Sequence, residues 1–337
     1  MMSVRKAKLI NQRDTILQDM LAGFVSAYSE IVRLTDDGLI VRAQPKAAGK
    51  VGLVIGNGSG HEPAMIGFVG DGLFDVNIPG ALFAAPGPER IVAGIRAADR
   101  GAGVLLCVSH HAGDLMNAEI ALELCQMEGI DKVEMVVLYD DISSAPKGCE
   151  PERRGTAGLF FTWKMLGAFA ETGASLAECK ALSERIRDNT RTLAVALSSC
   201  ASPITGEVMF DLPEGEMEIG MGVHGEVGTG RHKIASADTT IDLMLPRILD
   251  DLPFRAGDEV LVLLNNSGSM TLMELYILHG RVAALLKAAG IRHYKSWIGP
   301  YATTQEMAGF ALSLCRVDDQ LKQLWDAPAN GAFLKGV

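Results

Sequence analysis

The sequence predicts an α/β protein with two domains. The chain has 337 residues, more than a typical single domain, and 48% of them are hydrophobic, which is enough for sizeable cores. Short apolar runs, such as 51–55 and 104–108, alternate with segments of helical periodicity. A new strand that begins near Thr192 indicates the entry to the second domain. We therefore expect an N-terminal α/β domain at 1–188 and a C-terminal α/β domain at 189–337.

The regular elements follow from the spacing of apolar residues. An amphipathic helix is expected from Leu17 to Tyr28, where apolar side chains fall at helical spacing and Asp14 is placed to cap the helix. The other expected strands are at 51–55, 104–108, 133–139, 192–198 and 260–265. The other expected helices are at 89–100, from 115, through Phe161 to Ala168 after the segment 153–158, at 175–189, at 236–251 and after the glycine turn at 265–271.

The composition excludes several classes of partner. A formal net charge of −10 argues against nucleic acid or an anionic membrane as the main partner, whereas a neutral metabolite is compatible with it. No run reaches the roughly 18 apolar residues of a membrane span, and residues 1–13 lack the apolar core of a signal peptide, so we expect a cytoplasmic protein. Six widely spaced cysteines without a Cys-x-x-Cys pair indicate reduced, mostly buried thiols.

The stretch 55–63, Ile-Gly-Asn-Gly-Ser-Gly-His-Glu-Pro, is the main candidate for a ligand site. It follows an apolar strand, and its glycines let backbone amides approach a small ligand closely. His61 places a side chain that titrates near neutrality at the same point. In open α/β sheets, ligands bind at this end of the strands.

Asp114 lies where the strand 104–108 passes into a helix. One interpretation is an N-cap, since aspartate is among the best capping residues. The other interpretation is a carboxylate that faces a ligand, and the two are compatible. Farther along, His224 stands among glycines in Glu218–Glu226, which leaves its imidazole uncrowded. Two interpretations of His224 remain open, a structural histidine and a nucleophile.

Several stretches together resemble the K subunit family of dihydroxyacetone kinases. Residues 56–63 differ from the family's GGGSGHEP segment only at Asn57, and residues 218–226 resemble its E-x-G-x-G-I-H-G-E segment. Further resemblances occur, in the family's order, at 80–86, 109–117, 153–158, 196–203, 265–276 and 325–328. The resemblance therefore covers nearly the whole chain.

The resemblance implies two α/β domains with mixed sheets flanked by helices. It also implies a substrate-binding and catalytic K-type subunit of a ketose kinase. The implied catalytic residues are His224, which forms a hemiaminal with the substrate ketone, His61, which exchanges a proton with the resulting oxygen, and Asp114, the general base for the terminal hydroxyl. The further substrate-binding residues are Gly58, Ser59, Gly60 and Ser109.

The same resemblance implies the partners. The resemblance implies that the phosphate comes from a separate L subunit, which carries ADP or ATP with Mg²⁺. This chain shows no G-x-x-x-x-G-K-[ST] loop of its own. ATP and a phosphotransferase-system protein charged from phosphoenolpyruvate are both compatible as the ultimate donor. We expect no metal and no cofactor on this chain itself, and a homodimer as its assembly.

Departures from the family bear on the substrate. The family's lysine is Ser109, its Asn-Tyr-Thr is His110-His111-Ala112, and its nearby serine is Ala85. Loss of the lysine opens space and removes a charged donor, so a four-carbon ketose such as erythrulose competes with dihydroxyacetone. The two adjacent histidines lack an accompanying carboxylate pattern, so metal ligation is not expected.

Some alternatives remain open. Arg153 and Arg154 have surface charge as the default interpretation, with Asp140, Asp141 or an acidic partner as the other options. A second hypothesis for the whole chain is a non-catalytic ketose sensor that keeps the histidine chemistry and controls a regulator. A dinucleotide enzyme is a third, which the absence of a proper G-x-G-x-x-G fingerprint disfavours.

Overall fold

The computed structural model describes residues 8–336 and divides them into two compact units. We call residues 10–138, 159–187 and 320–336 the N-terminal unit. Residues 139–158 and 188–319, with Lys8 and Leu9, form the C-terminal unit. The longest segment of the C-terminal unit begins at Asp188, next to the expected boundary. The observed units nevertheless differ from two continuous domains, because 139–158 belongs to the C-terminal unit and 320–336 to the N-terminal unit.

A mixed six-stranded sheet forms the centre of the N-terminal unit. Its strand order is β1 (Val32–Leu34), β2 (Ile40–Arg42), β5 (Val76–Leu82), β3 (Gly52–Ser59), β6 (Val104–Ser109) and β7 (Val133–Leu138). β5, β3, β6 and β7 run parallel, whereas β2 pairs antiparallel with both β5 and β1. The carboxyl ends of β3 and β6 therefore meet at one edge of the sheet, where ligands bind in open α/β folds.

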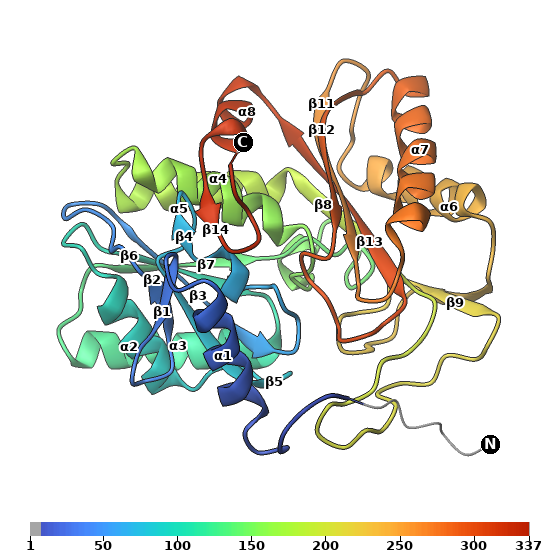
Figure 1. Cartoon of the computed structure of the whole chain (residues 1–337). Coiled ribbons are helices and arrows are strands. Elements are labelled where there is room, and N and C mark those ends of the chain that lie inside the picture. The colour runs from blue at the N-terminus through green and yellow to red at the C-terminus, as the bar shows by residue number, and fades with distance from the viewer. Residues whose placement is uncertain (1–7, 337) are drawn as a thin grey trace. The chain divides into compact units, whose positions relative to one another are not determined.

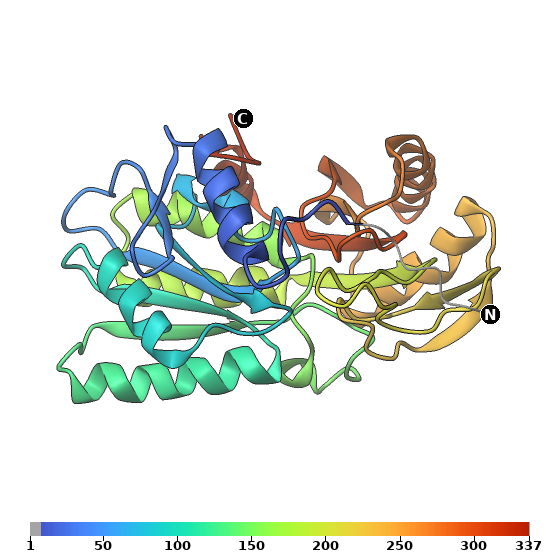
Figure 2. The ribbon, with the colours of Figure 1, turned by 60° about the horizontal axis from the view of Figure 1, so that its bottom comes forward.

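Helices cover both faces of this sheet (Figure 1). α2 (Pro88–Ala98) and α3 (Ala112–Met127) pack on one face through an apolar core that includes Val54, Ile95 and Leu106. Figure 2 shows the long α3 running alongside the strands. α4 (Leu159–Glu171) and α5 (Leu176–Asp188) lie on the opposite face, and nearly all of α4 is buried. The remaining elements are α1 (Ile16–Ala27), η1 (Ile66–Phe68), most of α8 (Asp319–Asp326) and the small sheet of β4 (Gly70–Asp71) and β14 (Asn330–Gly331).

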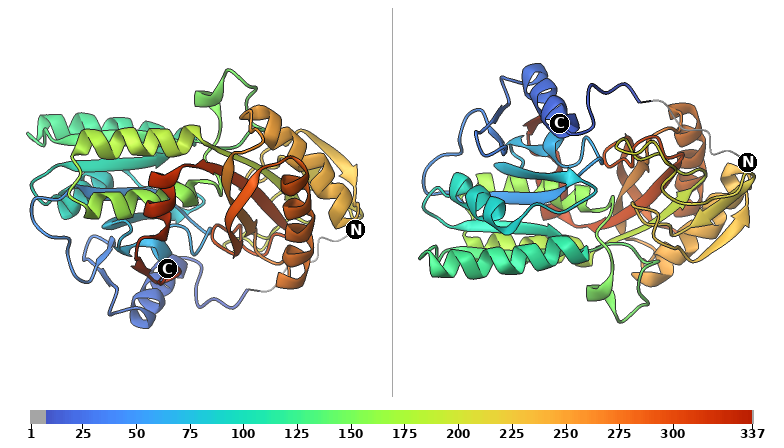
Figure 3. Two further views of the ribbon diagram at one scale, coloured as in Figure 1. Left: turned by 90° about the horizontal axis from the view of Figure 1, so that it is seen from above. Right: turned by 90° about the horizontal axis from the view of Figure 1, so that it is seen from below.

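The C-terminal unit has its own mixed six-stranded sheet. The order is β10 (Gly230–Lys233), β9 (Glu216–Ile219), β8 (Thr190–Ala196), β13 (Gly309–Val317), β11 (Glu259–Asn266) and β12 (Arg292–Gly299). Only the β11–β12 pair is parallel. α6 (Ala237–Asp251) and α7 (Leu272–Ala288) pack against its core and lie beside each other (Figure 3). A short helix, η2 (Glu150–Glu152), lies in the segment before α4.

The expected helices and strands are confirmed, with boundaries that shift by a few residues. The proposed cap Asp14 is wrong, because Thr15 occupies the N-cap position of α1. All six cysteines are free thiols, and only Cys149 is not fully buried. Among residues 8–336, no helix has both the length and the apolar character that a bilayer crossing requires.

Candidate active site

The glycine-rich stretch is a strand for most of its length. β3 continues through Ser59, so the expected turn after Ile55 begins only at Gly60. Glycine is required in this stretch because the segment 83–86 lies too close to leave room for side chains. A Cβ atom on Gly58 would lie 2.7 Å from the backbone nitrogen of Ala84, and one on Gly60 would lie 2.7 Å from the Phe83 ring. Gly60 also has a positive φ of 107°, which disfavours other residues.

His61 follows this bend and packs against Phe83, with ring centroids 5.2 Å apart in an edge-on arrangement. The backbone N–H of Gly60 donates to the Glu62 carboxylate over 2.9 Å. Burial raises the pKa of Glu62, although this hydrogen bond opposes the shift. Ser59 is buried and its hydroxyl donates to the Gly80 carbonyl, so its side chain stabilises the neighbouring segment. Glu62 is a titratable group beside His61 to which the sequence had assigned no role.

Asp114 lies in the first turn of α3, as its third residue. The N-cap interpretation is wrong, because His111 occupies that position. A carboxylate in the first turn is stabilised by the helix dipole. Gly113 faces Ala85, whose Cβ would lie 3.6 Å from a Cβ on that glycine, and Asn117 donates to the Pro86 carbonyl over 3.0 Å. The bend that carries His61 and the start of α3 thus both lie against the segment 83–86.

His224 lies in a glycine-rich loop between β9 and β10 of the C-terminal unit. Gly220 and Gly225 have φ values of 83° and 90°, and a Cβ on Gly225 would lie 2.5 Å from the Phe210 ring. At the far end of the loop, the backbone N–H of Gly228 donates to the buried carboxylate of Glu218 over 2.7 Å. The backbone therefore requires glycine at Gly220 and Gly225. The hydrogen bond to Glu218 fixes the end of the loop.

The imidazole of His224 is held by Glu226, two residues farther on. Nδ1 of His224 lies 3.1 Å from Oε1 of Glu226, and the backbone N–H of His224 donates to Oε2 over 2.8 Å. Burial would raise the pKa of the Glu226 carboxyl, but the hydrogen bond and charge of His224 outweigh burial and lower this pKa to about 2. The side chain of His224 is 29% exposed, so the ring remains accessible.

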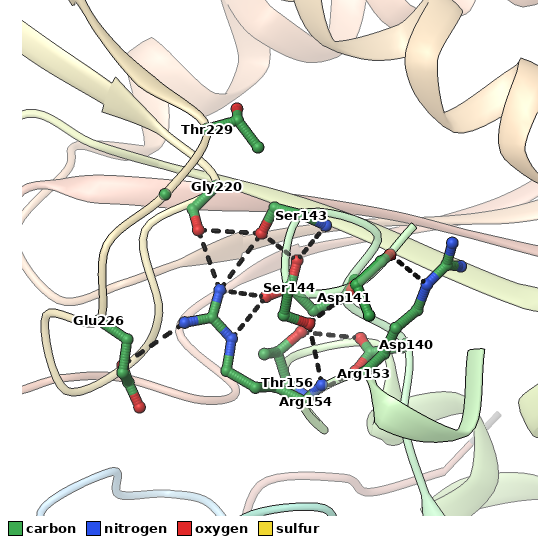
Figure 4. A network of polar contacts seen from close by, with 12 residues as sticks. Asp140, Asp141, Ser143, Ser144, Arg153, Arg154, Thr156, Gly220, Glu226 and Thr229 are labelled. Atoms are coloured by element: carbon green, nitrogen blue, oxygen red, sulfur yellow. Dashed lines mark hydrogen bonds and ion pairs between the residues drawn. The ribbon is translucent and has the colours of Figure 1, made fainter. Parts of the chain in front are cut away.

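Arg154 connects this loop to the segment after β7 (Figure 4). Its Nε and Nη2 donate to Oδ2 of Asp141 over 3.0 and 2.7 Å, and Nη2 also donates to the Gly220 carbonyl over 3.0 Å. Its Nη1 lies 3.9 Å from the carboxylate of Glu226. The sequence option that paired Arg154 with Asp141 is confirmed.

Arg153 is not a surface charge either. Its side chain is 1% exposed and donates to both carboxylate oxygens of Asp251 over 2.7 and 2.6 Å. Nearby, burial raises the pKa of Asp140 to about 6 even though Thr192 and Thr156 donate hydrogen bonds to it. Asp140 accepts further from the backbone N–H of Gly158, so it fixes the segment that leads into α4. The default interpretation of Arg153 and Arg154 as surface charges is therefore wrong.

The predicted site residues divide between the two units. Gly58, Ser59, Gly60, His61, Ser109 and Asp114 belong to the N-terminal unit, where they follow or end the neighbouring strands β3 and β6. His224 belongs to the C-terminal unit. The convergence of these residues on one ligand stays a prediction. The contacts of Glu226 with His224, and of Arg154 with Gly220 and Glu226, were not predicted from sequence, although both residues lie inside stretches that resemble the family.

Comparison with known proteins identifies the family. Residues 22–333 match the Dak1 domain family. The chain is 41% identical to the dihydroxyacetone-binding subunit DhaK of the PTS-dependent dihydroxyacetone kinase 1 of Listeria innocua, over 93% of this chain and 95% of that protein. It is 38% identical to the D-erythrulose kinase of Mycolicibacterium smegmatis, over 98% of this chain but only 57% of that longer protein.

A solved structure extends the comparison. The dihydroxyacetone kinase operon co-activator Dha-DhaQ superposes with a TM-score of 0.88 at 30% identity, covering 95% of this chain and 98% of that one. The fold of two α/β units with mixed sheets agrees with this likeness. The chain belongs to the Dak1 family, that of the dihydroxyacetone-binding DhaK subunits and the related ketose kinases.

Proposed function

We propose that this chain is the substrate-binding and catalytic K-type subunit of a kinase for dihydroxyacetone or another short-chain ketose. The observation that supports it most is the accessible imidazole of His224, whose Nδ1 contacts a carboxylate within a loop of glycines. Relatives named as dihydroxyacetone-binding subunits and as erythrulose kinases support the substrate class.

In this proposal, Nε2 of His224 adds to the ketone carbon of the substrate. A carbon–nitrogen bond forms, the π electrons of the carbonyl move to its oxygen, and His61 supplies the proton that makes this oxygen a hydroxyl. A plain polyol such as glycerol has no carbonyl, so it cannot form the hemiaminal. The protein therefore selects ketoses by a chemical step as well as by shape.

Phosphoryl transfer follows at the terminal hydroxyl. Asp114 accepts the hydroxyl proton as the oxygen attacks the terminal phosphorus of ATP, whose bond to the bridging oxygen breaks with ADP as the leaving group. The phosphate is supplied by a separate L-type subunit that carries ATP or ADP with Mg²⁺, and the names of PTS-dependent and PEP-dependent relatives support a phosphotransferase-system donor behind it. We further propose that the K-type chain is a homodimer.

Intact-protein mass spectrometry tests the binding step. The protein is incubated with dihydroxyacetone, erythrulose or glycerol. We expect a mass increase of one ketose molecule with each ketose and none with glycerol, because only a carbonyl can accept the imidazole. An unchanged mass with every ketose would remove the hemiaminal from the proposal.

The residue at position 109 is expected to set the preference among ketoses. Ser109 is 5% exposed at the end of β6, where the family has a lysine. Replacing Ser109 by lysine fills space and should disfavour the larger ketose. We expect the ratio of adduct stabilities to shift toward dihydroxyacetone over erythrulose by about 10–200-fold, the range by which a pocket distinguishes two ligands that differ by one methylene-sized group. Competition between the two ketoses, read by mass spectrometry, measures this ratio. Ser26→Lys on the exposed face of α1 is the control, and an equal ratio in both variants would contradict the assignment.

A second candidate function is a ketose-responsive co-activator without catalysis. The structural likeness to Dha-DhaQ, which is named as an operon co-activator, favours it. Retention of Asp114 favours the kinase instead, since a sensor needs no general base. Transfer of phosphate to a bound ketose in the presence of an L-type subunit distinguishes the two.

A further inference from the structure

Glu226 uses both of its carboxylate oxygens on His224. Oε1 contacts Nδ1 of the ring and Oε2 accepts the backbone N–H of the same residue. We infer that Glu226 is a positioning residue that fixes the Nδ1–H tautomer of His224 and stabilises the imidazolium formed when His224 adds to a ketone. This inference rests on the proposed hemiaminal chemistry.

The tautomer follows from what a carboxylate can do. An ionised carboxylate only accepts hydrogen bonds, so Nδ1 must carry the proton in the 3.1 Å contact with Oε1. In a neutral imidazole the lone pair then resides on Nε2, which is the atom that must attack the carbon. The low pKa of Glu226, about 2, keeps the carboxylate ionised at neutral pH.

The charge follows from the balance of the addition step. When Nε2 bonds to carbon, the ring keeps its Nδ1 proton and becomes a cation, while the former carbonyl oxygen takes a proton from His61. The carboxylate at 3.1 Å from Nδ1 interacts more favourably with this cation than with the neutral ring. Glu226 therefore favours the adduct over the unreacted histidine, and the proton stays on Nδ1.

The surrounding loop is built to hold the carboxylate in this place. A Cβ atom on Gly222 would lie 2.1 Å from Oε2 of Glu226 and 2.3 Å from Nη1 of Arg154, so only glycine leaves room for both groups. The backbone N–H of Gly222 also donates to the Glu226 carbonyl over 2.9 Å. Arg154, fixed by its paired hydrogen bonds to Asp141, lies on the Oε2 side of Glu226, whereas Oε1 contacts the ring of His224.

The Glu226→Gln variant distinguishes fixing of the His224 tautomer from simple packing of the loop. Glutamine has the same shape but only one acceptor oxygen, whereas His224 requires two acceptors, one for its backbone N–H and one for Nδ1–H. If the amide oxygen stays on the backbone N–H, the amide NH₂ faces Nδ1 and selects the Nε2–H tautomer. The nucleophilic lone pair is then on the wrong nitrogen.

The experiment compares wild type, Glu226→Gln and Glu214→Gln, which removes the same charge from an exposed position just before β9. The ¹⁵N NMR shifts of the His224 ring report the tautomer, and titration with dihydroxyacetone followed by mass spectrometry reports the adduct. We expect Nδ1–H in wild type and Glu214→Gln. In Glu226→Gln we expect Nε2–H and an adduct weakened by about 10–100-fold, the same loss as when a metal-bound histidine loses the partner that orients it.

An Nε2–H tautomer of His224 in the wild-type protein would overturn the inference. This measurement needs no variant, so the inference can be tested even if Glu226→Gln folds poorly. A Glu226→Gln protein that forms the adduct as well as wild type would overturn it too. Absence of an adduct in the wild-type protein would instead count against the proposed function. The tautomer of His224 in the wild-type protein would still test whether Glu226 places the proton on Nδ1.

Discussion

Replacement of His224 by alanine is expected to abolish the covalent ketose adduct and leave the fold intact. No other side chain is proposed to bond to the substrate carbon, so the loss should be complete and not a matter of degree. The loop path depends on its glycines and on Glu218, and alanine keeps the backbone N–H that donates to Glu226. Intact-protein mass spectrometry with dihydroxyacetone measures the adduct, and thermal unfolding measures the fold.

His232→Ala is the matched control for this prediction. His232 is an exposed histidine on β10 in the same unit, so its loss removes an imidazole without touching the loop. The control should form the adduct as wild type does. Equal amounts of adduct in His224→Ala and wild type would exclude His224 as the nucleophile, and His61 or a lysine would then be the candidate.

The sequence predicted the main strands and helices because each has a strong local signal. One strand that it missed, β5, lacks such a signal. β5 reads Val-Asn-Ile-Pro-Gly-Ala-Leu from 76 to 82, with proline and glycine inside a strand and no alternation of polar and apolar residues. It is nevertheless an interior strand, which pairs with β2 on one side and with β3 on the other. Its buried Asn77 adds contacts to β3, because it donates to the Ile55 carbonyl and to the side chain of Asn57.

That contact also explains a departure from the family pattern. Asn57 stands where the resembling motif has glycine, and its side chain accepts from Asn77 over 2.8 Å while donating to the Gly58 carbonyl over 2.7 Å. A polar side chain buried at this point is therefore hydrogen-bonded on both sides, which removes most of the cost of burial. The partner residue is 20 positions away on a strand that the sequence pattern did not reveal.

The charged contacts of the site were beyond local reasoning for the same reason. Arg154, Asp141, Gly220 and Glu226 meet because the segment after β7 lies against the loop after β9, which only the topology of the C-terminal unit decides. Arg153 likewise finds Asp251 at the end of α6. The residue types and their flanking glycines could be identified as candidates from sequence, whereas their partners could not.

Replacement of Asp114 by asparagine is expected to leave adduct formation intact and to slow phosphoryl transfer by about 10²–10⁴-fold, the usual contribution of a general base. Asparagine has nearly the same shape but cannot accept the proton of the terminal hydroxyl. Residue 114 lies in the first turn of α3, where loss of a negative charge costs only about 0.3–1 kcal/mol of helix stability. The fold should therefore survive. The measurement is ketose phosphate formed with the L-type subunit and its donor.

Asp238→Asn is the matched control, because Asp238 occupies the first turn of α6 and is exposed. It should transfer phosphate at the wild-type rate. An Asp114→Asn protein that turns over normally would remove the base from the mechanism, whereas one that no longer forms the adduct would make Asp114 a binding residue. If wild type itself forms the adduct and transfers nothing to it, the ketose is a signal, and the co-activator function accounts for the retained histidine chemistry better than a kinase does.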